Sequence, residues 1–327
     1  MDKKQWLLPA ALLFCTTAAV LSLLLGAVRL SPQQLWQALA GGPKSTAGYI
    51  FWYARLPRTA ACLLSGAALA VSGAVIQAVL SNKLASPGII GVNAGAGLAV
   101  TACCALGLLS GWVIALSAFG GAMVSVLLVV FTAQKTGASR TTVILGGVAM
   151  NSLLGAFTEA VYILDPDAGM QAVDFRVGGF SAVAFPRLIP AGVLILLGLI
   201  LAFTLTNELD VISLGDGTAQ GLGLSVKTVR TVFLLLAALL AGAAVSFSGL
   251  LGFVGLIVPH MARKLVGGES ARLIPLCAVG GAAFVTACDL AARLLFSPYE
   301  LPVGLLLAVV GGPFFFWLLL RRKEGAE

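Results

Sequence analysis

The stretches GAALAVSG at residues 66–73 and GAAVSFSG at residues 242–249 both begin with Gly-Ala-Ala and end with Ser-Gly. Each stretch follows a Leu-Leu pair at the same offset, at residues 63–64 and 239–240. The match indicates an internal duplication. If the two copies lie on membrane helices an odd number of crossings apart, they run in opposite directions, which is the inverted repeat of many transporters.

The composition of the chain is that of a membrane protein. Of its 327 residues, 59% are hydrophobic and 10% are charged, whereas soluble domains carry about 25% charged residues. Apolar stretches long enough to cross about 30 Å of hydrocarbon recur along the whole chain. The sequence therefore predicts an all-α, polytopic membrane protein that forms one transmembrane domain over residues 1–327. Its ten predicted transmembrane helices, of which the eighth is short, lie at residues 7–28, 56–80, 89–109, 112–133, 142–164, 188–206, 229–247, 250–261, 274–295 and 303–320.

Basic residues are distributed unevenly between the two sides of this predicted topology. With the amino terminus inside, 13 Lys and Arg residues lie at the cytoplasmic side and 7 at the outer side, out of 20 in all. The positive-inside rule therefore predicts that both termini are cytoplasmic, and it accounts for the net charge of +7. The chain has no aromatic-rich basic patch, so we expect no nucleic-acid partner. Its apolar spans are instead expected to contact membrane lipid.

The two copies of the repeat lie on the second and seventh predicted helices, which are five crossings apart and therefore antiparallel. Each copy is followed by a stretch broken by Gly and Pro, at residues 86–91 and 249–259. Paired interruptions of this kind point toward a translocation region. Alternatively, small residues only permit close packing of helices, and we favour that role for Gly66, Ala67 and Ala68.

The fifth predicted helix carries a row of polar and small residues. They fall at spacings of 4, 7, 8 and 11 from the first, which places them on one helical face. The row comprises Asn151, Gly155, Thr158, Glu159 and Tyr162. This face is a candidate lining of a transport pathway, because polar groups in hydrocarbon are costly unless they face water or a partner. The alternative for Glu159 is that it reaches headgroups or water at the outer boundary.

Motifs for catalysis and metal binding are missing from the sequence. It has no GxxxxGK[ST] phosphate loop, no HExxH and no GxSxG, so we expect neither ATP hydrolysis nor other enzyme activity in this chain. The six cysteines lie in apolar stretches and His260 is the single histidine, which argues against a metal site; no cofactor is predicted. Asp289 and Arg293, spaced i and i+4, are expected to form a structural ion pair.

Taken together, several motifs resemble the FecCD-type permeases of ABC importers, which carry ferric siderophores, haem or vitamin B12. The resemblance spans nearly the whole chain. It includes Asn82 with Leu84, Ala85 and Pro87, Asp289 with Ala292 and Arg293, and Gly312 with Pro313. It also includes RLPR at residues 55–58, residues 91–96, LGGVA at residues 145–149, LG at residues 222–223, GFVGLIVPHMAR at residues 252–263 and ELPVG at residues 300–304.

The resemblance implies a fold of ten helices per subunit, with helices two to five and seven to ten related by an inverted pseudo-twofold. It also implies a homodimer in the bacterial inner membrane, bound to two cytoplasmic ATP-binding subunits and supplied by an extracytoplasmic substrate-binding protein. The expected cargo is a ferric siderophore or related metal chelate, with haem or vitamin B12 as alternatives. An alternative of another class is a secondary transporter driven by H⁺ or Na⁺, in which Glu159 is the proton site.

The resemblance further implies roles for individual residues. Arg55, Arg58 and Arg293 match positions that dock the binding protein, and Ala138 and Ser139 match the cytoplasmic gate. The loop that couples to the ATPase comprises Gly215, Asp216, Gly217, Thr218, Ala219, Gln220, Gly221, Leu222 and Gly223. Gly217 and Gly221 depart from the usual pattern and lower helix propensity by about 1 kcal/mol each relative to alanine. Lys83 stands where the family commonly has proline.

Overall fold

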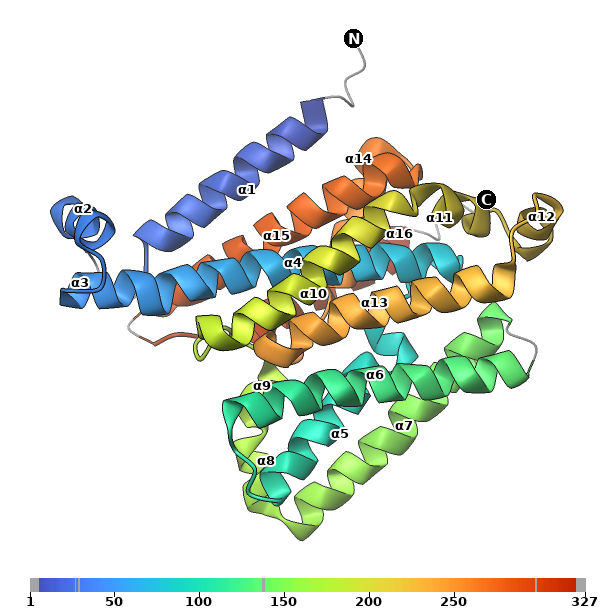
Figure 1. The fold of residues 1–327 in the computed structure, drawn as a ribbon, viewed down its shortest axis with the longest axis horizontal. Helices are drawn as coiled ribbons and strands as arrows, with labels where there is room; N and C mark the ends of the chain where they lie inside the picture. Colours follow the sequence, from blue (N-terminus) through green and yellow to red (C-terminus); the bar gives the residue numbers. More distant parts are fainter. Residues whose placement is uncertain (1–5, 27, 29, 137–138, 298, 322–327) are drawn as a thin grey trace.

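The structure is a computed structural model that describes residues 6–26, 28, 30–136, 139–297 and 299–321. Within these residues the chain is helical and forms no strand, which confirms the predicted all-α class. The long helices lie side by side in a bundle, with short helices at its two ends (Figure 1).

Each of the ten predicted spans overlaps one of the longer helices of the structure, with ends that differ by up to several residues. These helices are α1 (Leu7–Leu24), α4 (Leu56–Val79), α5 (Val92–Ala105), α6 (Gly111–Lys135), α7 (Arg140–Leu164), α10 (Phe185–Thr204), α13 (Val226–Ser248), α14 (Val254–Val266), α15 (Ser270–Leu295) and α16 (Val303–Arg321). By length and composition, 7 helices of the described chain are long and apolar enough to cross a membrane, and Val92–Ala105 and Val303–Phe316 are shorter apolar helices. The number of crossings therefore stays a prediction.

The connections contain short helices that the predicted spans did not include. The helix that holds α4 begins earlier than predicted, because α3 and a π-helical turn precede it without a break and make one helix of 34 residues, Thr46–Val79. The short elements are α2 (Pro32–Gly41), α3 (Thr46–Tyr49), the π-helix Ile50–Arg55, the 3₁₀ helix Pro87–Ile90, α8 (Pro166–Gln171), α9 (Val173–Val177), α11 (Thr206–Ser213) and α12 (Asp216–Gly221).

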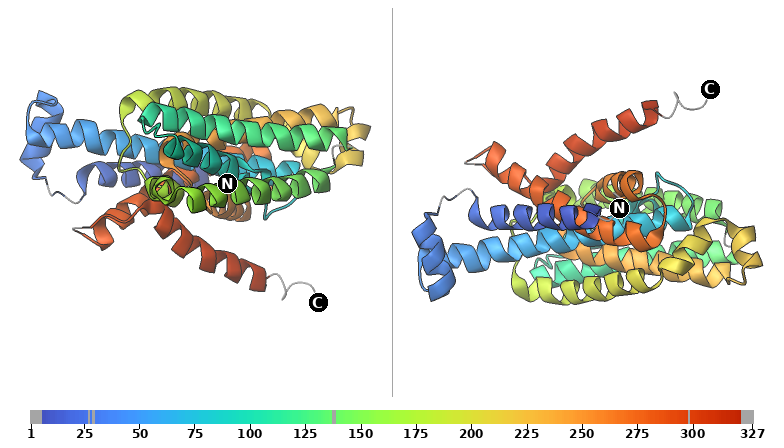
Figure 2. Two further views of the ribbon diagram at one scale, coloured as in Figure 1. Left: turned by 90° about the horizontal axis from the view of Figure 1, so that it is seen from below. Right: turned by 90° about the horizontal axis from the view of Figure 1, so that it is seen from above.

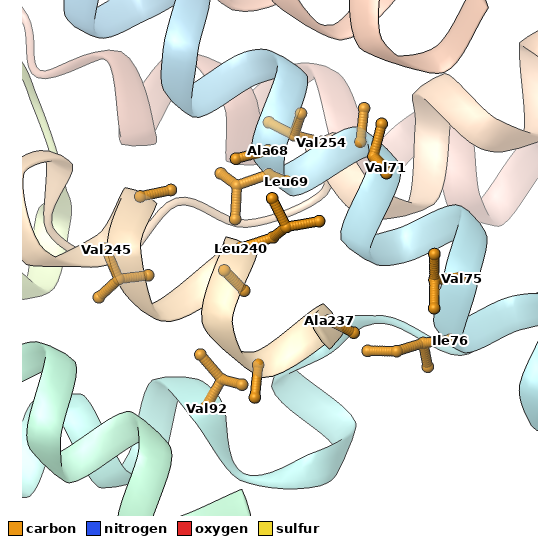
Figure 3. Packing of buried hydrophobic residues seen from close by; sticks show 14 of the residues in the cluster. Ala68, Leu69, Val71, Val75, Ile76, Val92, Ala237, Leu240, Val245 and Val254 are labelled. Carbon is orange, nitrogen blue, oxygen red and sulfur yellow. The ribbon is translucent and has the colours of Figure 1, made fainter. Parts of the chain in front are cut away.

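The first copy of the repeat lies at the centre of the bundle, in α4. A Cβ atom on Gly66 would collide with the backbone carbonyl of Gly281 in α15, and one on Gly73 would collide with that of Gly255 in α14. The helices therefore touch backbone to backbone, as small residues permit in membrane proteins. Figure 3 shows the aliphatic side chains that fill the space between α4 and α13, among them Leu240. The packing role that we favoured for Gly66 agrees with this geometry.

The packing of the two halves follows an inverted repeat. Helices α4 and α13, which carry the two copies, run in opposite directions (Figure 1). In the second copy, Gly242 of α13 lies against Ala122 and Phe119 of α6. The contact of α4 with α15 thus has a counterpart in that of α13 with α6, and the contact of α5 with α6 has one in that of α14 with α15.

The two copies differ at their last glycine. Gly73 remains inside α4, whereas Gly249 has a left-handed φ of 67° and follows the last residue of α13. The irregular stretch after it ends at Phe253, which also has a positive φ of 65°. In the first half, the break comes later, where Gly91 with φ of 93° separates the 3₁₀ helix from α5. Both predicted interruptions are present, and the second begins directly at the repeat.

Candidate functional site

A buried cluster of charges joins α4 to α15 at the end of the bundle where α4 begins. An Nη of Arg58 lies 3.0 Å from Asp289 and its other Nη lies 2.6 Å from Glu300. Arg293 pairs with Asp289 at 3.0 Å, as its i, i+4 spacing predicted. Asp289 is fully buried between the two guanidinium groups. Sequence reasoning missed Arg58 as a partner of Asp289, because 231 positions separate them in the chain.

The other two arginines expected to dock a partner protein are buried in this chain. Arg55 is 4% exposed and Arg293 is 3% exposed. Arg55 donates hydrogen bonds of 2.8 and 2.7 Å to the carbonyl oxygens of Leu23 and Leu24. Arg293 donates one of 2.7 Å to the Ser22 hydroxyl. These bonds satisfy groups at the carboxyl end of α1, where helix carbonyls have no partners within the helix, so both arginines fasten α1 to the bundle.

An open cavity of about 310 Å³ lies beside the charged cluster. Arg58 and Glu300 line one part of it, and Asp174 and Arg187 line another. Phe175 and other apolar residues complete the wall. Charges of both signs at the rim suit contact with a polar partner or with a large polar ligand.

The polar row on α7 is divided between inward and outward positions. Asn151 donates a hydrogen bond of 2.9 Å to the carbonyl oxygen of Gly88, in the broken stretch before α5. Tyr162 bonds to Thr101 of α5 at 3.1 Å. Both side chains are therefore engaged within the subunit, since buried backbone groups at an interrupted helix need partners. Glu159, at the edge of the row, is exposed.

Thr158 and Gly155 are the other two residues of the polar row on α7. Thr158 is half-buried and donates a hydrogen bond of 2.9 Å to the carbonyl oxygen of Leu154 in its own helix. A Cβ atom on Gly155 would meet no atom within 4 Å. In a single chain, Gly155 thus packs closely against no other helix and Glu159 is exposed.

Of the two predicted gate residues, Ala138 lies outside the described residues. Ser139 is the N-cap of α7, and its hydroxyl accepts a hydrogen bond of 3.1 Å from the backbone N–H of Thr142. This is the capping role that serine favours at a helix start. Ser139 therefore fixes the point at which α7 begins.

The predicted coupling loop contains a short exposed helix, α12, over part of its length. Gly215 with φ of 115° precedes it and Gly223 with φ of 84° follows it, conformations that glycine adopts without strain. Ala219 is buried and anchors the helix. Two leucines flank α12 on the surface, Leu214 at 62% and Leu222 at 64% exposure. α12 therefore has an exposed apolar side chain near each of its ends.

Asp216, the first residue of α12, is held by two arginines from other helices. It lies 2.6 Å from Arg230 of α13 and 3.1 Å from Arg140 of α7. The hydrogen bond from Arg230, with the attraction of both cations, holds the pKa of the Asp216 carboxyl below its usual value. Sequence reasoning missed these contacts, because the arginines lie on other helices and Arg140 is far from Asp216 along the chain.

Comparisons with known proteins agree with this architecture. The chain is 36% identical to the hemin transport system permease protein HmuU of Yersinia pestis, over 92% of this chain and 91% of that protein. It is 37% identical to the iron(3+)-hydroxamate import system permease protein FhuB of Bacillus subtilis, over 97% of this chain and 83% of that protein. It is 36% identical to the vitamin B12 import system permease protein BtuC of Vibrio cholerae, over 94% and 92%.

A solved structure shares the fold along nearly the whole chain. It is described as an inward-facing conformation of a metal-chelate type ABC transporter, with a TM-score of 0.86 and 29% sequence identity. The match covers 96% of this chain and 98% of that chain. A high TM-score over nearly all of both chains means that the helices of the two proteins are arranged alike.

Apolar helices in two inverted halves, with a protruding short helix at one end, define a multi-span membrane permease. The chain belongs to the FecCD transport family, whose profile matches residues 12–321. It is an ABC importer permease of that family, which confirms the resemblance read from its motifs. Membership also confirms that the chain is a translocation subunit, with ATP hydrolysis assigned to separate subunits.

Proposed function

We propose that this permease takes up a ferric siderophore or a related metal chelate across the bacterial inner membrane. The support is the full-length likeness to a metal-chelate type transporter and to an iron(3+)-hydroxamate permease. The hemin and vitamin B12 permeases are similar at 36% identity each. Haem and cobalamin are therefore the alternative cargoes, and an uptake assay with each ligand separates them. Both termini are proposed to be cytoplasmic, from the distribution of basic residues.

We propose that two cytoplasmic ATPase subunits bind at α12, and the exposed apolar pair Leu214 and Leu222 is the observation that carries this proposal. A homodimer is supported by apolar helix faces that nothing in a single chain covers. Helix α16 extends away from the other helices in Figure 2, and Val309 on it is 68% exposed. On α7, Leu145 is 63% exposed.

At the end of the bundle opposite α12, we propose that an extracytoplasmic binding protein docks over the charged cluster of Arg58, Asp289, Arg293 and Glu300. Arg58, Asp289 and Glu300 connect this surface to the cores of α4 and α15. Arg58 and Glu300 also line the open cavity. Of the three arginines matched to docking positions, Arg58 thus borders that cavity. Arg55 and Arg293 are buried and support the docking surface indirectly, by holding the carboxyl end of α1.

Replacing Leu222 by glutamate is expected to weaken binding of the ATPase subunits by about tenfold or more, as for an apolar residue at the centre of an interface. The measurement is co-purification of candidate ATPase subunits with the permease, followed by ATP-dependent uptake in proteoliposomes. Leu106→Glu is the matched control, because Leu106 is 73% exposed at the carboxyl end of α5, near the outer end of the third predicted helix and so away from the cytoplasmic side. Equal ATPase binding by both variants would contradict the assignment of α12.

Replacing Glu159 by glutamine is expected to leave ATP-dependent uptake unchanged within about twofold, as for an exposed substitution without a specific role. Glu159 is exposed on α7, and removing its charge abolishes proton binding at that position. Uptake and ATP hydrolysis are measured together in proteoliposomes. Loss of uptake with intact stimulation of the ATPase would instead favour the ion-coupled secondary transporter.

A further inference from the structure

The coupling helix α12 is linked by charge to the first turn of α7. Arg140, the first residue of α7, pairs with Asp216 at 3.1 Å and donates a hydrogen bond of 2.9 Å to the carbonyl oxygen of Ile212 in α11. It also donates to the hydroxyl of Ser81, in the turn that follows α4. One guanidinium group therefore joins α7 to α11, to α12 and to the end of the α4 segment.

The position of Arg140 needs an explanation beyond helix formation. A cation at the amino end of a helix is unfavourable, because the helix dipole presents positive charge there. Asp216 offsets that cost, and as the first residue of α12 it lies where a carboxylate suits the dipole of its own helix. The ion pair is thus the interaction that makes Arg140 favourable where α7 begins, one residue after the N-cap Ser139.

The rest of α12 is attached in a way that permits movement. Glycines with positive φ precede and follow it, Gly215 and Gly223. A Cβ atom on Gly217 or on Gly221 would meet nothing within 4 Å. Backbone freedom at both ends, together with open space along the helix, allows α12 to tilt as a unit about its anchor Ala219. A displacement of α12 then acts on its surroundings through Asp216.

Asp216 binds a cation from each half of the repeat. Arg140 belongs to α7, the last long helix of the first half, and Arg230 belongs to α13, the first of the second half. Arg230 is 3% exposed, so its end of the link is fixed in the bundle, whereas Arg140 is 22% exposed. The contact with Arg140 is the longer and more exposed of the two. Arg140 directly follows Ser139, one of the two predicted gate residues.

We propose that Asp216 is a positioning residue that transmits movement of α12 to the start of α7, with Arg140 as the receiving group and Arg230 as the fixed support. This proposal rests on the proposed binding of ATPase subunits at α12. A charged hydrogen bond resists displacement of its two partners in either direction, whereas an apolar contact lets two groups slide past each other. Asp216 thereby moves the start of α7, at Ser139, whenever the ATPases displace α12.

The test compares Asp216→Asn with Asp216→Glu in the full permease reconstituted with candidate ATPase subunits. In Asp216→Asn, uptake per ATP hydrolysed is expected to fall by about threefold to tenfold, since a partly exposed charged hydrogen bond is lost; ATPase binding is measured in parallel by co-purification. Asp216→Glu is expected to restore most of the uptake. Glu269→Gln is the matched control, because Glu269 forms an exposed pair with Arg272 at 3.2 Å outside this network.

A spin label at Thr141→Cys provides a readout that altered stability alone would not change. Thr141 is exposed beside Arg140, and the native cysteines are buried or, for Cys15, half-buried, so the label reaches chiefly the introduced thiol. The spectrum is expected to change on ATP binding in the parent chain and in Glu269→Gln, and to stay constant in Asp216→Asn.

Three outcomes decide the matter. Loss of the ATP-dependent spectral change in Asp216→Asn, with ATPase binding intact, supports the proposal. Coupled uptake at the parent level overturns it, and so does loss of ATPase binding, because Asp216 would then belong to the contact itself. Failure of the parent chain to bind any ATPase subunit is a separate result, which contradicts the proposed function instead.

Discussion

Replacing Asp289 by asparagine is expected to lower the free energy of unfolding by about 3–5 kcal/mol, the usual effect of removing one partner from a buried ion pair. Asp289 is fully buried, and it is the shared partner of Arg58 and Arg293. Without its charge, two guanidinium groups remain in a region of low dielectric with only Glu300 at the surface to compensate. The measurement is thermal and denaturant unfolding of the purified permease in detergent.

Glu269→Gln is the matched control for Asp289→Asn, because it too removes one carboxylate charge from an ion pair. The Glu269 pair lies at the amino end of α15. The Glu269 and Arg272 side chains are 54% and 50% exposed, and exposed pairs contribute about 0–1 kcal/mol. If Asp289→Asn were as stable as Glu269→Gln, the charged cluster would not be what holds α4 against α15, and the glycine contacts would have to suffice.

Replacing Gly73 by alanine is expected to destabilise the fold by about 3 kcal/mol or more, the upper part of the range for overpacking. The added Cβ would collide with the carbonyl oxygen of Gly255. A backbone atom cannot rotate away as a flexible side chain does, so α4 and α14 must separate. Yield of folded protein and unfolding temperature are the measurements.

Gly120→Ala in α6 is the matched control for Gly73→Ala. It also lies inside a long apolar helix, but a Cβ atom there would meet nothing within 4 Å. Its expected effect is small, since alanine also favours helix by about 1 kcal/mol over glycine. Equal stability of the Gly73 and Gly120 variants would show that α4 and α14 can move apart without cost.

Much of the fold was predictable because helix-forming patterns are local. Apolar stretches placed the ten helices, and the repeat of Gly-Ala-Ala predicted the antiparallel pair α4 and α13. The continuous helix that contains α4 was predicted to begin too late, at residue 56 and not at Thr46, because the charge of Arg55 interrupts the apolar run. In the structure the Arg55 guanidinium donates hydrogen bonds to carbonyl oxygens of α1. The charge is therefore stabilised inside the protein, and the helix continues through residue 55.

The site was less predictable, because its contacts join residues far apart in the chain. Only Asp289 with Arg293, one helical turn apart, was predicted as a pair. Arg58 reaches Asp289 because glycines bring α4 against α15, and no local pattern reports that approach. Asp216 was assigned to a coupling loop by resemblance alone, and its two arginines became apparent only once α7, α12 and α13 were placed.

The attachment of α1 has a consequence for assembly during synthesis. Its carboxyl end is held by Arg55, from the next long helix, and by Arg293, whose partner Ser22 lies 271 positions earlier. Helix α1 leaves the ribosome before α15, yet one of its two attachments is made only after α15 has entered the membrane. A helix that is synthesised early is thus fixed in place late, and a residue from the second half of the repeat completes the position of α1.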